Sequence, residues 1–227
     1  MKILFIYTNI NGQHADSFAD GISMIMAVTK KAGHEIKQVQ IFEKLEYEMF
    51  KDEVKAYKPD VIGFTAVSSQ FSFVAELCVM AKDISPKVIT VCGGIHPTLY
   101  PECLKEAPSL DLIFRGDSEV PFLTFLQSLK NNQSWKENES IAYLRDDGTV
   151  KKNKLAALPT PEELDKMPFP DRETFPYDKI LQKVGIASFH FTRGCPFVCT
   201  YCSNIGIAKV YGQSRYNIRQ ASPEHSI

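Results

Sequence analysis

The strongest constraint on the fold of this chain is a regular alternation of apolar runs and helix-period segments over its first 130 or so residues. The apolar runs are short and nearly continuous, which is typical of strands covered on both faces of a parallel sheet. Predicted strands span Lys2–Tyr7, Glu35–Phe42, Val61–Thr65, Lys87–Cys92 and Asp111–Arg115. Predicted helices span Ala15–Lys31, Leu45–Tyr57, Phe71–Asp83, Pro97–Glu106 and Ser118–Lys130. Consecutive βα units predict an α/β fold with a doubly wound parallel sheet.

The regular alternation of strands and helices stops after residue 131. Two apolar runs flank Asp146-Asp147-Gly148 and predict a hairpin. A proline-rich stretch follows and predicts a stiff extended linker. Gly185–Thr192 is a further apolar run and is predicted to be a strand. We therefore divide the chain into a first domain, residues 1–131, a hairpin and linker, residues 132–184, and the start of a second domain, residues 185–227.

Composition narrows the class of protein. The net charge is −1 and no block of Lys and Arg occurs, which argues against nucleic acid as a partner. No run of about 18 apolar residues occurs, so no membrane-spanning helix is expected. The first apolar run is too short for a signal peptide. Six cysteines, three of them clustered, fit a reducing cytoplasmic compartment.

The clustered cysteines are Cys195, Cys199 and Cys202, with the spacing C-x3-C-x2-C. Three thiolates this close can hold three corners of a 4Fe-4S cluster and leave the fourth iron open for a small molecule. Zinc is the alternative. A structural zinc site takes four ligands, so the fourth would have to come from His190 or a distant residue such as Cys103.

This cysteine loop resembles the signature of the radical S-adenosylmethionine superfamily, with Tyr201 as the aromatic residue before the third cysteine. The resemblance implies that S-adenosylmethionine binds the open iron beside Tyr201. One electron, from an external reductant, then cleaves it to a 5′-deoxyadenosyl radical. It also implies a β/α barrel whose first strand is Gly185–Thr192. Because such a barrel takes about 200 residues, we expect this chain to be the N-terminal portion of an enzyme, with the barrel truncated and the fragment inactive.

In the first domain, small and hydroxylated residues follow several predicted strands, where open α/β sheets bind their ligands. The segments are 8–12, 65–69, 93–98 and 115–119. Small side chains at each strand end leave space for a bulky planar ligand. The adjacent glycines Gly93 and Gly94 let the backbone approach it closely.

These segments, together with Gly33-His34-Glu35 and residues 59–64, resemble the Rossmann-like cobalamin-binding domain that precedes many radical S-adenosylmethionine barrels. The resemblance implies that cobalamin is bound by Thr65, Ser68, Gly93 and Gly94 along its nucleotide tail and by Gly116 and Glu119 at the rim. The Asp-x-His motif that binds cobalt in mutases is absent, and His14 stands in that loop without it. We therefore expect no protein histidine on cobalt. His96 either contacts the corrin or bonds locally in a turn.

Together these features predict part of a cobalamin-dependent radical S-adenosylmethionine enzyme that acts on a small-molecule substrate. Methyl transfer to an unactivated centre is the reaction we expect, and the catalytic residues are not identified. Three alternatives stay open. The chain could be a cobalamin-binding module without catalysis, a radical cyclase or rearrangement enzyme, or an iron–sulfur or zinc protein whose first domain is only a scaffold.

Overall fold

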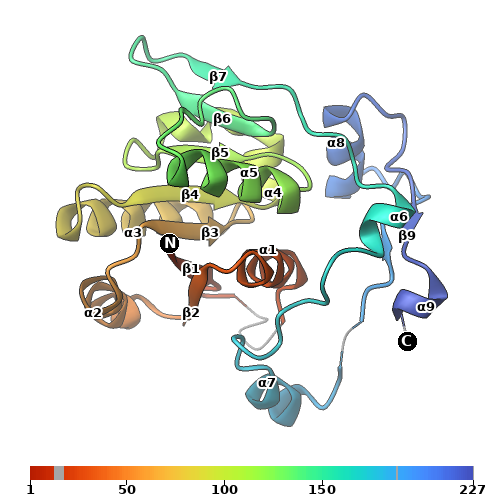
Figure 1. Ribbon diagram of the computed structural model, residues 1–227, viewed down its shortest axis with the longest axis horizontal. Helices are drawn as coiled ribbons and strands as arrows, with labels where there is room; N and C mark the ends of the chain where they lie inside the picture. Colours follow the sequence, from red (N-terminus) through yellow and green to blue (C-terminus); the bar gives the residue numbers. More distant parts are fainter. Residues whose placement is uncertain (13–17, 188, 227) are drawn as a thin grey trace.

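The fold is a seven-stranded sheet with helices on both faces (Figure 1). The computed structural model describes residues 1–12, 18–187 and 189–226, so His14 and the start of the first predicted helix lie outside the described residues. The strand order is β2-β1-β3-β4-β5-β6-β7, and the first five strands are parallel. They are β1 (Lys2–Thr8), β2 (Glu35–Ile41), β3 (Val61–Thr65), β4 (Ile89–Gly93) and β5 (Leu112–Phe114). The prediction of a doubly wound parallel sheet is confirmed.

The helices between these strands lie close to their predicted positions. They are α1 (Asp20–Lys31), α2 (Tyr47–Tyr57), α3 (Phe71–Ile84), α4 (Ile95–Leu99) and α5 (Glu119–Lys130), with the 3₁₀ turns η1 (Lys44–Glu46) and η2 (Pro101–Lys105). The single helix predicted over 97–106 is instead α4 and η2. Tyr100 separates them with φ −130° and ψ 72°, because a residue before proline avoids the helical region.

The predicted hairpin forms as β6 (Ile141–Leu144) and β7 (Val150–Lys152). It does not stand apart from the first domain, because β6 pairs antiparallel with β5 through Phe114 and Ile141. The sheet of the first domain therefore continues into residues that the sequence places in the linker.

The rest of the chain wraps around one end of this sheet (Figure 1). Its elements are α6 (Pro161–Leu164), α7 (Tyr177–Val184), β8 (Thr192–Arg193), α8 (Ser203–Val210), β9 (Arg219–Gln220) and α9 (Pro223–Ser226). Among the described residues of the predicted strand Gly185–Thr192, only Thr192 lies in a strand. Gly185 ends α7 in a left-handed conformation, φ 71°. The described residues 186, 187 and 189–191 pair with no strand.

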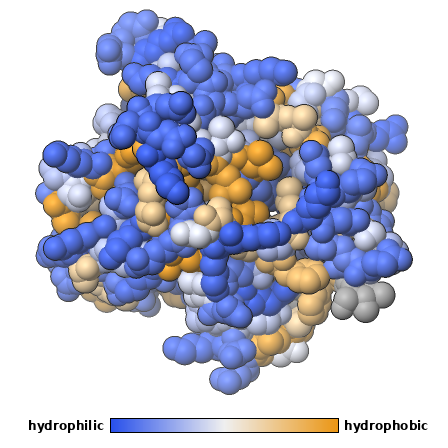
Figure 2. Space-filling view, viewed as in Figure 1, coloured by the Kyte–Doolittle hydropathy of each residue, from blue (hydrophilic) through white to orange (hydrophobic). Residues whose placement is uncertain are grey.

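None of the helices among the described residues combines the length and apolarity that a membrane crossing requires. Hydrophilic side chains cover most of the face shown in Figure 2, around an apolar area near its centre.

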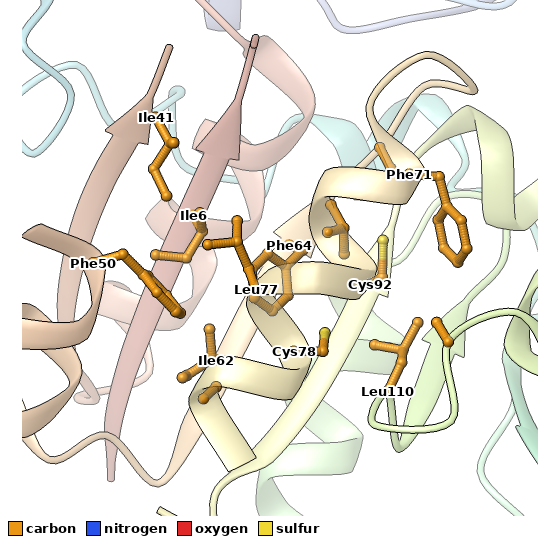
Figure 3. Close-up of a cluster of buried hydrophobic side chains, with 14 of the residues drawn as sticks. Ile6, Ile41, Phe50, Ile62, Phe64, Phe71, Leu77, Cys78, Cys92 and Leu110 are labelled. Atoms are coloured by element: carbon orange, nitrogen blue, oxygen red, sulfur yellow. The ribbon is translucent and has the colours of Figure 1, made fainter. Parts of the chain in front are cut away.

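The sheet separates two apolar cores. Alternate residues of β1 point to opposite faces, so Ile3 and Phe5 join one core while Leu4 and Ile6 join the other. Helices α1 and α5 cover the first core, and α2 and α3 cover the second (Figure 3). Burial on both faces explains why the strand sequences are continuously apolar.

One polar network joins the amino-terminal ends of β4 and β5. Asp111 Oδ2 accepts hydrogen bonds from Lys82 Nζ at 2.6 Å and from the backbone N–H of Thr90 at 2.8 Å. We expect Asp111→Ala to lower the free energy of unfolding by about 1.5–3 kcal/mol in urea denaturation, because Lys82 and Thr90 both lose a charged acceptor. Lys55→Ala, which breaks only the exposed pair with Asp52, is the control and should change stability by less than about 0.5 kcal/mol. Equal losses in the two variants would contradict this role for Asp111.

Candidate cofactor site

A cavity of about 1130 Å³ lies where the carboxyl ends of the parallel strands face the C-terminal segment. It exceeds the volume of about 300–1,000 Å³ that is usual for small-molecule pockets. Strands β3 and β4, helix α1, the β5–α5 loop, and residues from 164–173 and 189–193 all contribute to its walls. The cavity therefore has room for a ligand larger than most metabolites, at the edge of the sheet where open α/β folds bind ligands.

Glycines leave the floor of the cavity open. A Cβ built on Gly93 would meet no atom within 4 Å, and Gly93 lines the cavity. A Cβ on Gly63 would approach the ring of Phe5 at 3.1 Å, and both residues line the cavity. A larger side chain at Gly93 would thus extend into space that no other residue fills.

Gly94 brings two loops together. Its φ of 100° is unfavourable for other residues. A Cβ on Gly94 would lie 2.7 Å from the carbonyl oxygen of Ala66 and 2.9 Å from Thr65 Oγ1. The N–H of Ala66 also donates to the carbonyl of Gly93 at 3.0 Å. Glycine here allows the loops after β3 and β4 to touch, so that Thr65, Gly93 and Gly94 share one wall of the cavity.

Ser68 has a different partner from the one the resemblance implies. It is not among the residues that line the cavity, and its Oγ lies 3.0 Å from His96 Nδ1. The His96 ring is 4.6 Å from the ring of Phe71 and 5.7 Å from that of Tyr100, between centroids. Burial lowers the pKa of His96. These local contacts favour the turn role for His96 over a contact with the corrin.

The other two predicted rim residues, Gly116 and Glu119, line the cavity and also contact the C-terminal segment. A Cβ on Gly116 would collide with the hydroxyl of Tyr211. Glu119 is only 6% exposed, and its Oε1 lies 2.6 Å from Arg193 Nη2. Glu119 therefore already has a cationic partner from the chain itself.

The loop that carries the cysteines is anchored at both ends. On one side, the N–H of Cys195 donates to the carbonyl of Tyr216 at 2.8 Å, next to the antiparallel pair β8–β9. On the other, the N–H of Cys202 donates to the carbonyl of Cys199 at 3.0 Å, and α8 begins at Ser203.

Within the part of the chain that the structure describes, no three Cys, His, Asp or Glu side chains are placed to hold a single metal ion. A structural zinc site needs its ligands around one point. The candidate fourth ligands are also engaged. His190 pairs with Asp20 at 3.0 Å, and Cys103 is buried, which raises the pKa of its thiol to about 12. A 4Fe-4S cluster does not need its three cysteines around one point, because each cysteine binds a different iron.

Tyr201 is 91% exposed. Its predicted place beside S-adenosylmethionine therefore rests on the resemblance, and its ring is accessible to a ligand at the cysteine loop.

Sequence reasoning missed the residues that hold the two parts together. Asp117, on the cavity rim, accepts from Arg219 Nη1 at 2.8 Å and from Tyr216 Oη at 3.0 Å. Burial raises the pKa of Asp117, but Arg193 and Arg219 outweigh this and hold its pKa below the ordinary value. The available signal is a pair of acidic residues, Asp117 and Glu119, just after the fifth predicted strand.

Comparison with known proteins agrees with this geometry. Residues 14–126 match the family model of the B12 binding domain. The anaerobic magnesium-protoporphyrin IX monomethyl ester cyclase of Rubrivivax gelatinosus is 29% identical over 218 residues, which is 89% of this chain and 38% of that protein. The cytidylyl-2-hydroxyethylphosphonate methyltransferase of Streptomyces wedmorensis is 28% identical over 81% of this chain and 43% of its own length.

Two solved structures share the fold. The cobalamin-dependent S-adenosylmethionine radical enzyme OxsB, with aqua-cobalamin and S-adenosylmethionine bound, superposes with a TM-score of 0.77 at 17% identity, over 99% of this chain and 30% of its own. The radical S-adenosylmethionine methyltransferase TsrM of Kitasatospora setae has a TM-score of 0.77 at 13% identity, over 99% of this chain and 44% of its own. The chain spans less than half the length of each of these proteins. The comparisons confirm the resemblance to cobalamin-binding radical S-adenosylmethionine proteins.

Proposed function

We propose, from the premise that this chain carries a domain of the B12-binding family, that it binds cobalamin in the cavity and a 4Fe-4S cluster at Cys195, Cys199 and Cys202. The observation that carries the proposal is the position of the cavity. It opens at the carboxyl ends of β3 and β4 and is closed on its far side by residues that lead directly into the cysteine loop. Both cofactors would then lie at the same interface.

The residues of this chain position and shield these cofactors. Thr65, Gly93 and Gly94 form the wall against which the nucleotide tail of cobalamin lies, and Gly116 forms part of the rim. Tyr201 lies beside S-adenosylmethionine at the open iron. When bound, the cofactors supply reductive cleavage of S-adenosylmethionine and transfer of a methyl group. An external one-electron reductant and a small-molecule substrate complete the reaction.

Within this class we propose methyl transfer to an unactivated centre. The similarity to a phosphonate methyltransferase supports this reaction. Radical cyclisation is the second candidate, because a cyclase is similar to the same degree. The six cysteines of the chain are all free thiols, which supports action in a reducing cytoplasm.

Anaerobic reconstitution tests the proposal. The purified chain is incubated with ferrous iron, sulfide and hydroxocobalamin, separated by gel filtration, and assayed for iron and cobalt. We expect about four irons and about one cobalamin per chain. If the protein elutes without the corrin, the first domain is only a scaffold. If it holds a single zinc ion, the proposal of a 4Fe-4S cluster is wrong.

A further inference from the structure

A buried ionic network joins the cavity rim to both strands that flank the cysteine loop. Asp117 lies in the loop between β5 and α5. Its Oδ2 accepts from Arg219 Nη1 at 2.8 Å and from Arg193 Nη1 at 3.2 Å, and its Oδ1 accepts from Tyr216 Oη at 3.0 Å. Its backbone N–H donates to Tyr211 Oη at 2.9 Å. One side chain thus receives three hydrogen bonds from residues 76 to 102 positions away in the sequence.

The network is electrically balanced and largely buried, although the side chains of Asp117 and Arg193 are 18% and 23% exposed. Arg193 also reaches Glu119 at 2.6 Å, so two carboxylates face two guanidinium groups. Glu119 is 6% exposed, and Tyr216 and Arg219 are each 8% exposed. Buried charges tolerate only a narrow range of geometries, because any separation leaves a desolvated charge without its partner. A network of this kind fixes one arrangement of the parts it joins.

An apolar contact between the two parts specifies their arrangement less closely than the ionic network does. Helix α8 packs on α4, where a Cβ on Gly206 would lie 2.9 Å from Leu99 Cδ2. This contact is apolar, so it favours close approach without specifying direction. The cysteine loop itself is largely open, with Phe197 and Tyr201 exposed. The ionic network is the contact that ties both arms of this loop to the cavity rim.

We propose that Asp117 is a positioning residue that sets the distance between the cysteine loop and the cavity. Arg193 lies two residues before Cys195 and Arg219 lies on the paired strand β9, so both arms of the loop are tied to one carboxylate on the cavity rim. Glu119 belongs to the same network and also lines the cavity. The proposal rests on the proposed function for the identity of what is being positioned.

The first test needs no cofactor. Hydrogen exchange of the cofactor-free chain is measured for Asp117→Asn and for the control Lys152→Met, which breaks an exposed pair with Glu102. We expect the amide of Cys195 and those of β8 and β9 to exchange about 100-fold faster in Asp117→Asn. Amides of β1, β3 and β4 should keep their protection, and the control should match the parent chain. Tyr216→Phe, which removes one hydrogen bond, should give a smaller increase of about fivefold.

The second test distinguishes a residue that sets the distance between the two cofactors from one that only stabilises the fold. The reconstituted chain is reduced so that cob(II)alamin and the cluster are both paramagnetic, and the magnetic coupling between them is measured. The parent chain should give one narrow distance distribution, and Asp117→Asn a broad one with cobalt and iron content unchanged. An unchanged distribution, or unchanged exchange of the Cys195 amide in the first test, would overturn the proposal. Failure to bind cobalamin would refute the proposed function alone, because the exchange result stands without it.

Discussion

Replacing Gly93 by valine is expected to weaken binding of hydroxocobalamin by about 100-fold while leaving the fold intact. A Cβ at this position meets no protein atom within 4 Å, so the added methyl groups do not overpack the chain. They extend instead into the cavity that Gly93 lines, and they remove volume that the ligand needs. Gly93 is the last residue of β4, and a β-branched side chain is well suited to a strand. The measurement is a titration followed by absorbance.

Lys151→Val is the matched control. It places the same side chain on β7, at a position that does not line the cavity. We expect its affinity for hydroxocobalamin to equal that of the parent chain, and the midpoint of thermal unfolding to stay within a few degrees in both variants. If Gly93→Val binds the corrin as tightly as the control does, the ligand does not lie at the carboxyl end of β4.

The first domain could be predicted from its sequence because its signals are local. Each strand of the parallel sheet is buried on both faces, as Ile3, Leu4, Phe5 and Ile6 show in β1, and this burial appears directly as an apolar run. The glycine pair at the end of β4 is also visible in the sequence. The structure explains it, because the backbone conformation of Gly94 and its close approach to Ala66 admit only a residue without a side chain.

Features that depend on distant residues could not be predicted. The run Gly185–Thr192 has the composition of a strand, but strand formation needs a neighbour, and most of the run has none among the described residues. The partners of Asp117 lie 76 to 102 positions away, and nothing near them in the sequence marks the pairing. The resemblance implies that Ser68 binds the nucleotide tail of cobalamin, whereas its contact with His96 depends on the path of the loop after β3.

Replacing Cys199 by alanine is expected to reduce the iron content of the reconstituted chain from about four atoms to near zero. Each of the three cysteines would hold a different iron of the cluster, so the loss of one thiolate leaves a second iron without a protein ligand. The measurements are iron and sulfide per chain and the electron paramagnetic resonance signal after dithionite.

Cys103→Ala is the control that separates ligation from loss of a thiol. Cys103 lies in η2, outside the cysteine loop, and is buried in the second apolar core, where burial raises the pKa of its thiol to about 12. This variant should lose about 1 kcal/mol of stability through a small cavity, yet it should retain the iron and the signal of the parent chain. Iron content that falls equally in the two variants would mean that the protein binds iron non-specifically. If Cys199→Ala retains its iron, the cluster is not bound at the cysteine loop. The chain would then lack the open iron on which cleavage of S-adenosylmethionine depends.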